Sequence, residues 1–372
     1  MLLHQRIKKL LTQLKHLFMR SRATYLILTI VLAITGIALL RFRPWKYAGA
    51  TADVIHVGGN KKASRELTIG FLPVTCHLTC PVTDFASKNT QTSTNFNSRL
   101  FTDFPTVVSA MEAKQIQATF MIAPLAMKLR EQGVPVKICY LGHRDGSEIV
   151  VGKNSNIRSL TDLKGKKIAL PSLFSNQNFV IHKLMEDYGM KPDDITFVIL
   201  PPPDMPTSLA SGAIDGYFVG EPFCAKAELD GTGRILYYAR DIWPNFISCV
   251  LVVHEDLINA KPDVVKDLVN GIAQSGLWAE THRAEAAKLV APYYHQNEKV
   301  LNYVLTSSPE RVKYVGLTPT DEDLQRIQDM GMKLGFLKKK IPMTDIIDRR
   351  FIPKAIAPAA ISVATIKSPQ AN

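Results

Sequence analysis

Short apolar runs alternate with amphipathic stretches from Glu66 onward, and this alternation predicts strands and helices in turn. Apolar runs predict strands at 67–72, 118–122, 136–142, 195–200 and 213–220. Apolar positions three and four apart predict helices at 105–115, 124–133, 175–190 and 206–212. A short helix, a turn and a strand are expected within 160–171, and most of 262–336 is expected to be helical. A repeated strand–helix order is typical of an α/β fold.

Two apolar runs, Glu148–Lys153 and Ser248–His254, stand outside this order. We interpret them as segments that cross between two lobes, and we expect 248–254 to pair with the segment around Ile149–Val151. The predicted fold is therefore α/β, with two βα lobes joined by two crossing strands and a hinged cleft between them. The expected limits are 66–150 for lobe I, 151–247 for lobe II, 248–350 for the return to lobe I, and 351–372 for a poorly ordered tail.

Residues 23–40 form an uncharged, largely apolar segment between two basic stretches. As a helix it spans about 27 Å at 1.5 Å per residue, close to the hydrocarbon thickness of a bilayer. The positive-inside rule expects 1–22 in the cytoplasm and the body, after a linker at 41–65, on the other side of the membrane. An uncleaved signal-anchor fits this pattern somewhat better than a signal peptide cleaved near Ala48–Ala50, which lies unusually far beyond the apolar run, and a buried core helix fits it less well. We expect a periplasmic or otherwise extracytoplasmic protein, held at the inner membrane if the segment is retained.

The formal net charge of +12 does not indicate nucleic-acid binding. Nine of the 45 basic residues precede position 47, where no acidic residue occurs, so the rest of the chain holds 36 basic and 33 acidic residues. Such a body lacks the basic stripe that gathers phosphates, and no nucleic-acid partner is expected. The five cysteines are too few and too scattered for a disulfide framework, and most are expected to be small buried hydrophobic residues.

Polar residues follow the first predicted strand, where ligands gather in α/β folds. Thr75, His77 and Thr79 offer hydroxyls and an imidazole to a bound molecule. The alternative is a helix start with Thr79 as its N-cap and Pro81 behind it. Cys76, His77 and Cys80 also invite a zinc site, but three ligands fall short of the four that structural sites use, so neither a metal nor a cofactor is expected.

Further candidates occupy other loops between predicted elements. The run from Ser172 to Asn178 supplies a helix N-cap and several extra polar groups, which suits an anion at a helix N-terminus. The predicted ligand-binding residues outside the first loop are Ala123, Arg144, Ser172, Ser175, Asn176, Gln177, Glu221, Phe223 and Trp243. For Ala123 the expected contact is a backbone N–H, and for Arg144 a fork onto an oxyanion. The alternatives are a solvated turn for Arg144, a structural salt bridge for Glu221, and packing between the lobes for Trp243.

The segment Val198–Ala227, with its PPPDMP and GEPF elements, resembles the nitrate/bicarbonate/sulfonate substrate-binding proteins of ABC importers. The resemblance extends over roughly residues 66–350. It includes the stretches 118–147, 162–171, 189–195, 241–245 and 261–265. It implies a type II periplasmic-binding-protein fold, a small and anionic solute held between the lobes, and delivery to an ABC permease with a cytoplasmic ATPase.

Two departures from the family pattern weigh against nitrate or bicarbonate as the ligand. The first loop is PVTCHLTCPVTD at Pro73–Asp84, and the aromatic residue of the GEPF element is Phe223 rather than tryptophan. The chain shows no nucleophile elbow, P-loop or dinucleotide-binding glycine pattern, which favours binding over catalysis. The competing hypothesis is an enzyme on the same fold, of the thiamine-pyrimidine-precursor or menaquinone pathway type, with His77 and Cys80 as its reactive residues. A membrane-tethered sensor is a third hypothesis, but the short stretch before residue 23 holds no signalling module.

Overall fold

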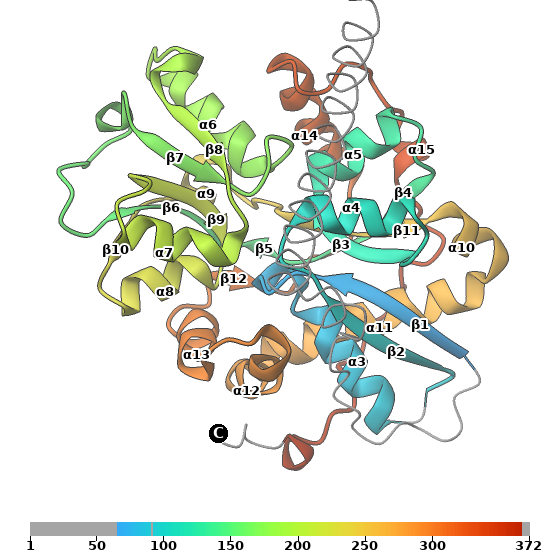
Figure 1. Cartoon of the computed structure of the whole chain (residues 1–372). Coiled ribbons are helices and arrows are strands. Elements are labelled where there is room, and N and C mark those ends of the chain that lie inside the picture. Colours follow the sequence, from blue (N-terminus) through green and yellow to red (C-terminus); the bar gives the residue numbers. More distant parts are fainter. Residues whose placement is uncertain (1–64, 91, 367–372) are drawn as a thin grey trace, which may run out of the picture. The chain divides into compact units, whose positions relative to one another are not determined.

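Two five-stranded sheets organise the computed structural model, which describes residues 65–90 and 92–366 (Figure 1). The first sheet has the order β2-β1-β3-β11-β4. Its strands are β1 (Arg65–Phe71), β2 (Thr94–Leu100), β3 (Ala118–Ile122), β4 (Val136–Leu141) and β11 (Cys249–His254). Strands β2 and β3 run parallel to β1, whereas β11 is antiparallel to both of its neighbours. This sheet forms the centre of lobe I.

The second sheet forms the centre of lobe II and has the order β10-β6-β9-β7-β8. Its strands are β6 (Ser147–Gly152), β7 (Lys167–Leu170), β8 (Thr196–Ile199), β9 (Gly216–Gly220) and β10 (Gly233–Tyr238). The short strand β5 (Arg144–Asp145), on the connection that leads into β6, pairs with β12 (Val312–Lys313), which lies between α13 and α14. Two sheets with helices on their faces agree with the predicted α/β fold.

Helices cover both sheets. Those of lobe I before the crossing are α3 (Thr79–Asn89), α4 (Phe104–Glu112) and α5 (Ala123–Glu131), and those of lobe II are α6 (Asn176–Asp187), α7 (Met205–Ala210), α8 (Phe223–Leu229) and α9 (Ala239–Ile242). The later helices are α10 (Glu255–Ala260), α11 (Pro262–Thr281), α12 (Arg283–Tyr294), α13 (Glu298–Thr306), α14 (Asp321–Lys333) and α15 (Met343–Ile346). Short 3-10 turns occur at η1 (Thr75–His77), η2 (Thr161–Leu163), η3 (Pro192–Asp194), η4 (Pro202–Asp204) and η5 (Val363–Thr365).

The helix starts follow local sequence signals. Asp103 accepts a hydrogen bond from the backbone N–H of Thr106 at 2.8 Å, and Pro105 occupies the first turn of α4. A helix N-cap was predicted within the run from Ser172 to Asn178, and Ser175 provides it by accepting from the N–H of Asn178 at 3.1 Å. Gly189, with a φ of 66°, ends the segment after α6 in the left-handed conformation that glycine tolerates.

The predicted pairing of 248–254 with 149–151 is wrong. Strand β11 joins the lobe I sheet between β3 and β4, whereas β6 lies between β9 and β10 in lobe II. Both runs are buried on both faces, so their apolar character predicted strands but carried no information about which sheet each would join. The connections between the sheets are instead the segments 142–146 and 243–248.

The C-terminal segment differs from expectation as far as the structure describes it. Ala359 donates from its backbone N–H to the carbonyl of Gln274 in α11 at 3.0 Å, and Ala359 and Ile361 are buried. The predicted poorly ordered tail therefore follows a defined path as far as Ile366. The predicted membrane segment at 23–40 lies outside the described residues, and within 65–90 and 92–366 no helix is long and apolar enough to cross a bilayer.

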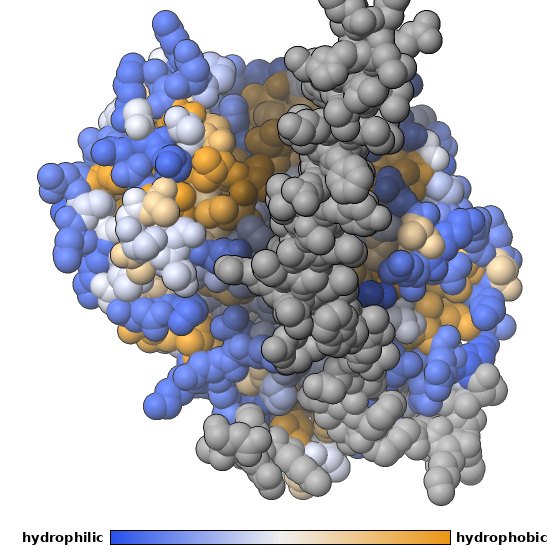
Figure 2. Space-filling model, viewed as in Figure 1, coloured by the Kyte–Doolittle hydropathy of each residue, from blue (hydrophilic) through white to orange (hydrophobic). Residues whose placement is uncertain are grey.

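On the face in Figure 2, hydrophilic side chains dominate the outer parts, with apolar ones between them over lobe II at the left.

Candidate functional site

Eight buried residues from both lobes and from the two connections form what we term the interlobe cluster. Each of them is at most 2% exposed to solvent. The cluster consists of Thr75, Cys76, His77, Ser147, Asn176, Gln177, Ser248 and Cys249. Four of the predicted ligand-binding residues, Thr75, His77, Asn176 and Gln177, are thus brought together here.

The first turn of α6 contributes two amides to the interlobe cluster. Gln177 donates from Nε2 to the hydroxyls of Ser147 and Ser248, both at 3.1 Å. Asn176 donates from Nδ2 to the backbone carbonyl of Ile247. The amide oxygens of both side chains are buried and have no hydrogen-bond partner in the described part of the chain. These oxygens are acceptors that a bound molecule with N–H or O–H groups would satisfy.

His77 is held in one orientation by its surroundings. The backbone N–H of Leu72 donates to its Nδ1 at 2.7 Å, and its ring stacks on Phe120 with 5.4 Å between centroids. Because Nδ1 accepts, the neutral ring carries its proton on Nε2, which makes that nitrogen a donor. Nε2 is buried without a hydrogen-bond partner among residues 65–90 and 92–366. It is therefore available to an acceptor within the cluster.

Thr75 connects lobe I to lobe II. Its backbone N–H donates to the carbonyl of Glu221 at 2.7 Å, and its hydroxyl lies 2.9 Å from Nε2 of His143. Burial lowers the pKa of His143 to about 3, with a smaller contribution from His77, so the ring is neutral at physiological pH. Thr79 begins α3 and its hydroxyl is buried. The alternative prediction of a helix start is thus correct, but Leu78 rather than Thr79 occupies the N-cap position.

Glu221 forms an ion pair with Arg311, which lies 90 residues later in the sequence. Its carboxylate bonds to the guanidinium of Arg311 and accepts from the N–H of Ala225 at 2.9 Å, while Arg311 also donates to Glu228 at 2.5 Å. Burial raises the pKa of Glu221, and the charge of Arg311 partly offsets that rise. This geometry matches the salt-bridge alternative for Glu221. Phe223, the next predicted site residue, is buried at the start of α8.

Other predicted residues are committed to contacts outside the interlobe cluster. Arg144 donates to the carbonyls of Gly316 at 2.9 Å and Asn245 at 3.2 Å, and to the carboxylate of Asp323 at 2.8 Å. The solvated turn suggested for Arg144 is therefore wrong, because its guanidinium is bonded to three partners and its side chain is only 13% exposed. The guanidinium of Arg326 lies 4.2 Å from the ring centroid of Trp243, which is itself buried.

Two predicted helix-start groups are satisfied locally. The N–H of Ala123 donates to the carbonyl of Ser248 at 3.1 Å, so it is not free for a ligand. Ser172 accepts from the N–H of Phe174 at 3.0 Å, and Ser175 donates to the carbonyl of Ser172 at 2.7 Å while capping α6. These contacts order the loop before α6, and they leave Asn176 and Gln177 as the side chains of that loop that reach the cluster.

The possible metal ligands around His77 differ from the predicted set of Cys76, His77 and Cys80. Cys76, His77 and Cys249 have side-chain ligand atoms within 4.8 Å of one another, whereas Cys80 lies with its sulfur 3.9 Å from the carbonyl of Ile69. Cys249 was not a candidate because it lies in a run predicted as a strand, 173 residues after Cys76. Sequence patterns within one loop could not find it.

Glu148 is a second feature that the sequence reasoning missed. It is fully buried in β6, and neither carboxyl oxygen has a hydrogen-bond partner within the described residues. Its oxygens lie within 4.8 Å of the side-chain ligand atoms of Glu221 and Cys224. Burial, followed by repulsion from Glu221, raises the pKa of Glu148 well above its ordinary value, which favours the protonated form.

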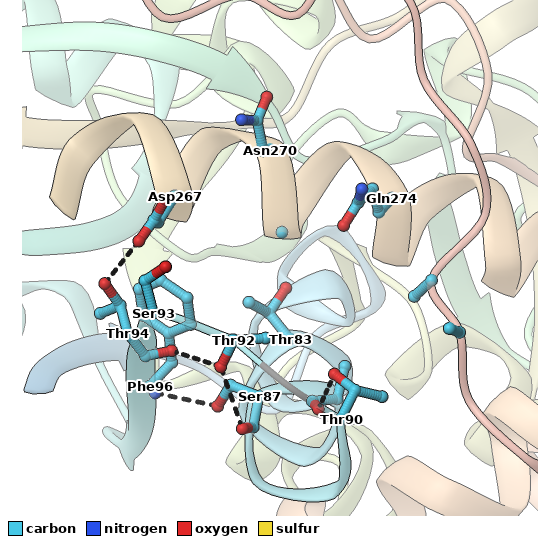
Figure 3. Close-up of a pocket in the computed structure, with 14 residues that line it drawn as sticks. Thr83, Ser87, Thr90, Thr92, Ser93, Thr94, Phe96, Asp267, Asn270 and Gln274 are labelled. Carbon is cyan, nitrogen blue, oxygen red and sulfur yellow. Dashed lines mark hydrogen bonds between the residues drawn. The ribbon is translucent and has the colours of Figure 1, made fainter. Parts of the chain in front are cut away.

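A separate pocket of about 250 Å³ opens on lobe I (Figure 3). It lies between α3, β2, α11 and the segment at Ala359, and hydroxyl and amide side chains line most of it. Its one carboxylate, Asp267, accepts from Thr94 at 2.6 Å and Arg65 at 3.0 Å. None of the interlobe residues lines this pocket, and we do not assign the solute site to it.

Relatives of the chain include transport proteins. It is 26% identical over 274 residues to the nitrate import ATP-binding protein NrtC of Synechocystis sp., covering 67% of this chain and 41% of that protein. It is 26% identical over 211 residues to a putative aliphatic sulfonates-binding protein of Bacillus subtilis, covering 56% and 62%. It is 28% identical over 171 residues to the taurine-binding periplasmic protein of Escherichia coli, covering 45% and 52%. The chain thus spans less than two thirds of the length of these relatives.

Solved structures share the fold. The ligand-binding component of an ABC-type import system from Staphylococcus aureus, with zinc bound, has a TM-score of 0.71 at 23% identity and covers 78% of this chain and 99% of its own. The periplasmic nitrate-binding protein NrtA from Synechocystis has a TM-score of 0.66 at 15% identity, covering 73% and 82%. The desulfurization enzyme DSZB also matches, with a TM-score of 0.55 at 15% identity, 77% and 97% coverage, so this fold carries catalysis as well as binding. The model of the NMT1-like family matches residues 60–293, which is more than half of the sequence, and the chain belongs to that family.

Proposed function

We propose that this protein is the extracytoplasmic substrate-binding component of an ABC-type importer and that it captures a small polar solute between its lobes. The observation that carries the proposal is the interlobe cluster, in which polar side chains from both lobes are buried with unsatisfied acceptors and a donor. Burying polar groups without partners costs about 1–3 kcal/mol each, so a molecule that satisfies them is favoured. The names of the relatives, which include nitrate import and sulfonate- and taurine-binding proteins, support the same class of function.

The proposed partners follow from that role. A solute-binding protein delivers its ligand to a permease, which a cytoplasmic ATPase drives, and two relatives are named as ATP-binding proteins of nitrate and bicarbonate transport. The segment 23–40 would hold the protein at the outer face of the inner membrane, or would be removed as a signal peptide. Closure of the lobes is the signal that the permease would recognise.

The chemistry of the cluster favours a solute with both acceptors and donors. The start of the 12-residue helix α6 favours negative charge, and Nε2–H of His77 is a donor, so both suit an oxyanion. The free oxygens of Asn176 and Gln177 require donors instead. An anionic solute that also carries an N–H group, as an aminosulfonate does, matches both sets better than nitrate.

The surroundings of Cys80 favour a binding role for this protein over the enzyme hypothesis. The enzyme hypothesis relied on His77 with Cys80, but the Cys80 sulfur contacts the carbonyl of Ile69 and burial raises the pKa of its thiol well above the ordinary value. A thiol of this kind is a poor nucleophile. Incubation of the protein with each solute that binds it, followed by mass spectrometry, is expected to return the solute unchanged.

The binding test uses the full chain purified in detergent and thermal unfolding with taurine, alkanesulfonates, nitrate and bicarbonate as separate probes. A solute at 100 times its Kd adds about 2.7 kcal/mol of stability. Asn176→Ala is expected to weaken the binding of that solute by about 1–3 kcal/mol. Asn89→Ala is the matched control, because its amide donates to the carbonyl of Phe85 at 2.8 Å within α3, away from the cluster. Unchanged affinity in Asn176→Ala would contradict the assignment of this site.

A further inference from the structure

We propose that Cys76 and Cys249 form a disulfide that joins η1 to β11 in lobe I, directly against the interlobe cluster. Their sulfur atoms lie 2.8 Å apart, closer than two thiols of neighbouring residues approach by ordinary packing. Both side chains are buried, at 2% and 1% exposed. The proposal requires export of the body from the cytoplasm but does not depend on which solute the protein binds.

The backbone around the pair is built for this approach. Gly142 lies against both cysteines, and its N–H donates to the carbonyl of Cys249 at 2.9 Å. A Cβ at position 142 would lie 2.1 Å from the carbonyl oxygen of Cys76 and 3.2 Å from that of Cys249. Only glycine therefore lets the η1 turn approach β11 closely enough for the two sulfur atoms to meet.

The two thiols differ in reactivity in the way that disulfide exchange requires. Burial by itself raises the pKa of Cys249, but several contributions, led by the hydrogen bond from Cys76, outweigh burial and lower that pKa to about 5. Burial raises the pKa of Cys76. Cys249 is therefore the attacking thiolate, and Cys76 is the thiol that resolves the intermediate.

A metal is the main alternative use of Cys76, His77 and Cys249. A histidine that binds a metal donates its other ring N–H to an acceptor, whereas Nδ1 of His77 accepts the N–H of Leu72. Metal binding through Nε2 would therefore require the neutral ring to lose its one N–H proton and become an imidazolate. The trio also supplies three protein ligands rather than the four of a structural zinc site.

The remaining cysteines are not arranged for pairing. The Cys80 sulfur lies 3.9 Å from the carbonyl of Ile69, and the Cys224 sulfur lies 3.3 Å from that of Val219. Cys139 is buried, and desolvation raises the pKa of its thiol. One disulfide and three thiols account for the odd number of cysteines in the chain.

The reaction is a thiol–disulfide exchange with a disulfide oxidant, either glutathione disulfide or a protein of the dithiol oxidase class. The Cys249 thiolate attacks one sulfur of the oxidant, forms a mixed disulfide and releases one thiol. The Cys76 sulfur, after losing its proton, then attacks the Cys249 sulfur and releases the second thiol. Two cysteine thiols and one oxidant disulfide thus give one protein disulfide and two oxidant thiols. Because both sulfurs are buried, the exchange is expected during folding after export or while the lobes are open.

The test is thiol counting on the full chain, produced with export in a bacterial host and isolated without reductant. After unfolding in an alkylating reagent, we expect three labelled cysteines, and five if the protein is first reduced. Peptide mass spectrometry is expected to find residues 76 and 249 in one cross-linked peptide. The variant Cys249→Ser is expected to show four labelled cysteines with or without reductant. The matched control Cys139→Ser is expected to show two without reductant and four with it.

Three results would overturn the proposal. The first is five labelled cysteines in the unreduced protein, also after refolding with glutathione disulfide. The second is a cross-link that joins Cys80, Cys139 or Cys224 instead. The third is one equivalent of zinc bound to the unreduced protein, with its loss in Cys249→Ser and not in Cys139→Ser. The wild-type cross-link map decides the question even if a serine variant fails to fold.

Discussion

The side-chain amide of Gln177 donates to the hydroxyl of Ser248 at 3.1 Å and to that of Ser147 at the same distance. Ser147 opens β6 at the end of one connection between the lobes, and Ser248 precedes β11 at the end of the other. One amide at the start of α6 thus contacts both connections. Movement of the lobes would change these contacts, so the amide is a means by which solute binding and closure are coupled.

Replacement of Gln177 tests this coupling. Gln177→Ala removes two hydrogen bonds in a buried site, and we expect solute affinity to fall by about 1–3 kcal/mol, roughly 5- to 150-fold in Kd by calorimetry. Gln325→Ala is the control, because that glutamine donates to Asp329 at 2.7 Å on the exposed side of α14. Equal affinities in the two variants would exclude a role for Gln177 in binding.

Arg311 is expected to be more important for stability than the exposed arginines of the described residues, 65–90 and 92–366. Arg311→Met leaves the buried carboxylate of Glu221 without its cation, and breaking a buried pair from one side costs about 3–5 kcal/mol. Arg349→Met, which breaks an exposed pair with Asp321, is expected to cost less than about 1 kcal/mol. Urea unfolding of both variants measures the difference. Adding Glu221→Gln to Arg311→Met is expected to recover part of the loss, and no recovery would argue against this cause.

The strands that the sequence pattern predicted and those that it missed differ in how continuous their apolar runs are. Central strands such as β3 and β9 are buried along their whole length, and their apolar runs predicted them. The missed strands β2 and β10 are edge strands of the two sheets, partly exposed and interrupted by polar residues. The other two edge strands, β4 (VKICYL) and β8 (TFVI), were predicted because their runs are mostly apolar, so an edge position alone does not hide a strand.

The site was predictable only where its residues share a loop or a helix start. Thr75 and His77 follow β1, and Asn176 and Gln177 open α6, so their position after strands indicated them. Arg144 and Glu221 also had that position, but their partners Asp323 and Arg311 are 179 and 90 residues away. Such long-range contacts decide which polar residue of a loop faces the ligand and which one forms an ion pair instead.

Glu148 is expected to make stability depend on pH. Its pKa is raised in the folded protein, so below about pH 4.5 both folded and unfolded states hold the proton and there is no cost. Above that pH the unfolded state loses the proton while the folded state retains it, and stability falls by up to about 1.4 kcal/mol per pH unit until the folded pKa is reached. The groups that face Glu148 are Glu221, Glu228, Cys224 and Arg311.

Glu148→Gln removes this titration. Relative to wild type, the variant is expected to gain stability steadily from pH 5 to pH 8, by about 1 kcal/mol or more, in urea unfolding at each pH. Glu112→Gln, at the exposed end of α4, is expected to follow the wild-type pH profile. A constant difference between Glu148→Gln and wild type across this range would mean that Glu148 is ionised in the folded protein.

Helix α14 and the residues after it join the two lobes, and this contact is expected to control solute release. The Phe336 ring stacks on Phe179 of α6 at 5.6 Å, and α14 also contacts α5 of lobe I. Because aromatic pairs contribute about 0.5–1.5 kcal/mol each and Phe336 also meets Phe174 at 6.3 Å, Phe336→Ala is expected to destabilise the closed form by about 1–2 kcal/mol. Stopped-flow measurement should show a release rate roughly 5- to 30-fold higher. Phe197→Ala is the control, because it loses a ring contact with His182 inside lobe II. This variant should lower stability and leave the release rate unchanged. Equal release rates in the two variants would show that the contact between lobes does not govern release.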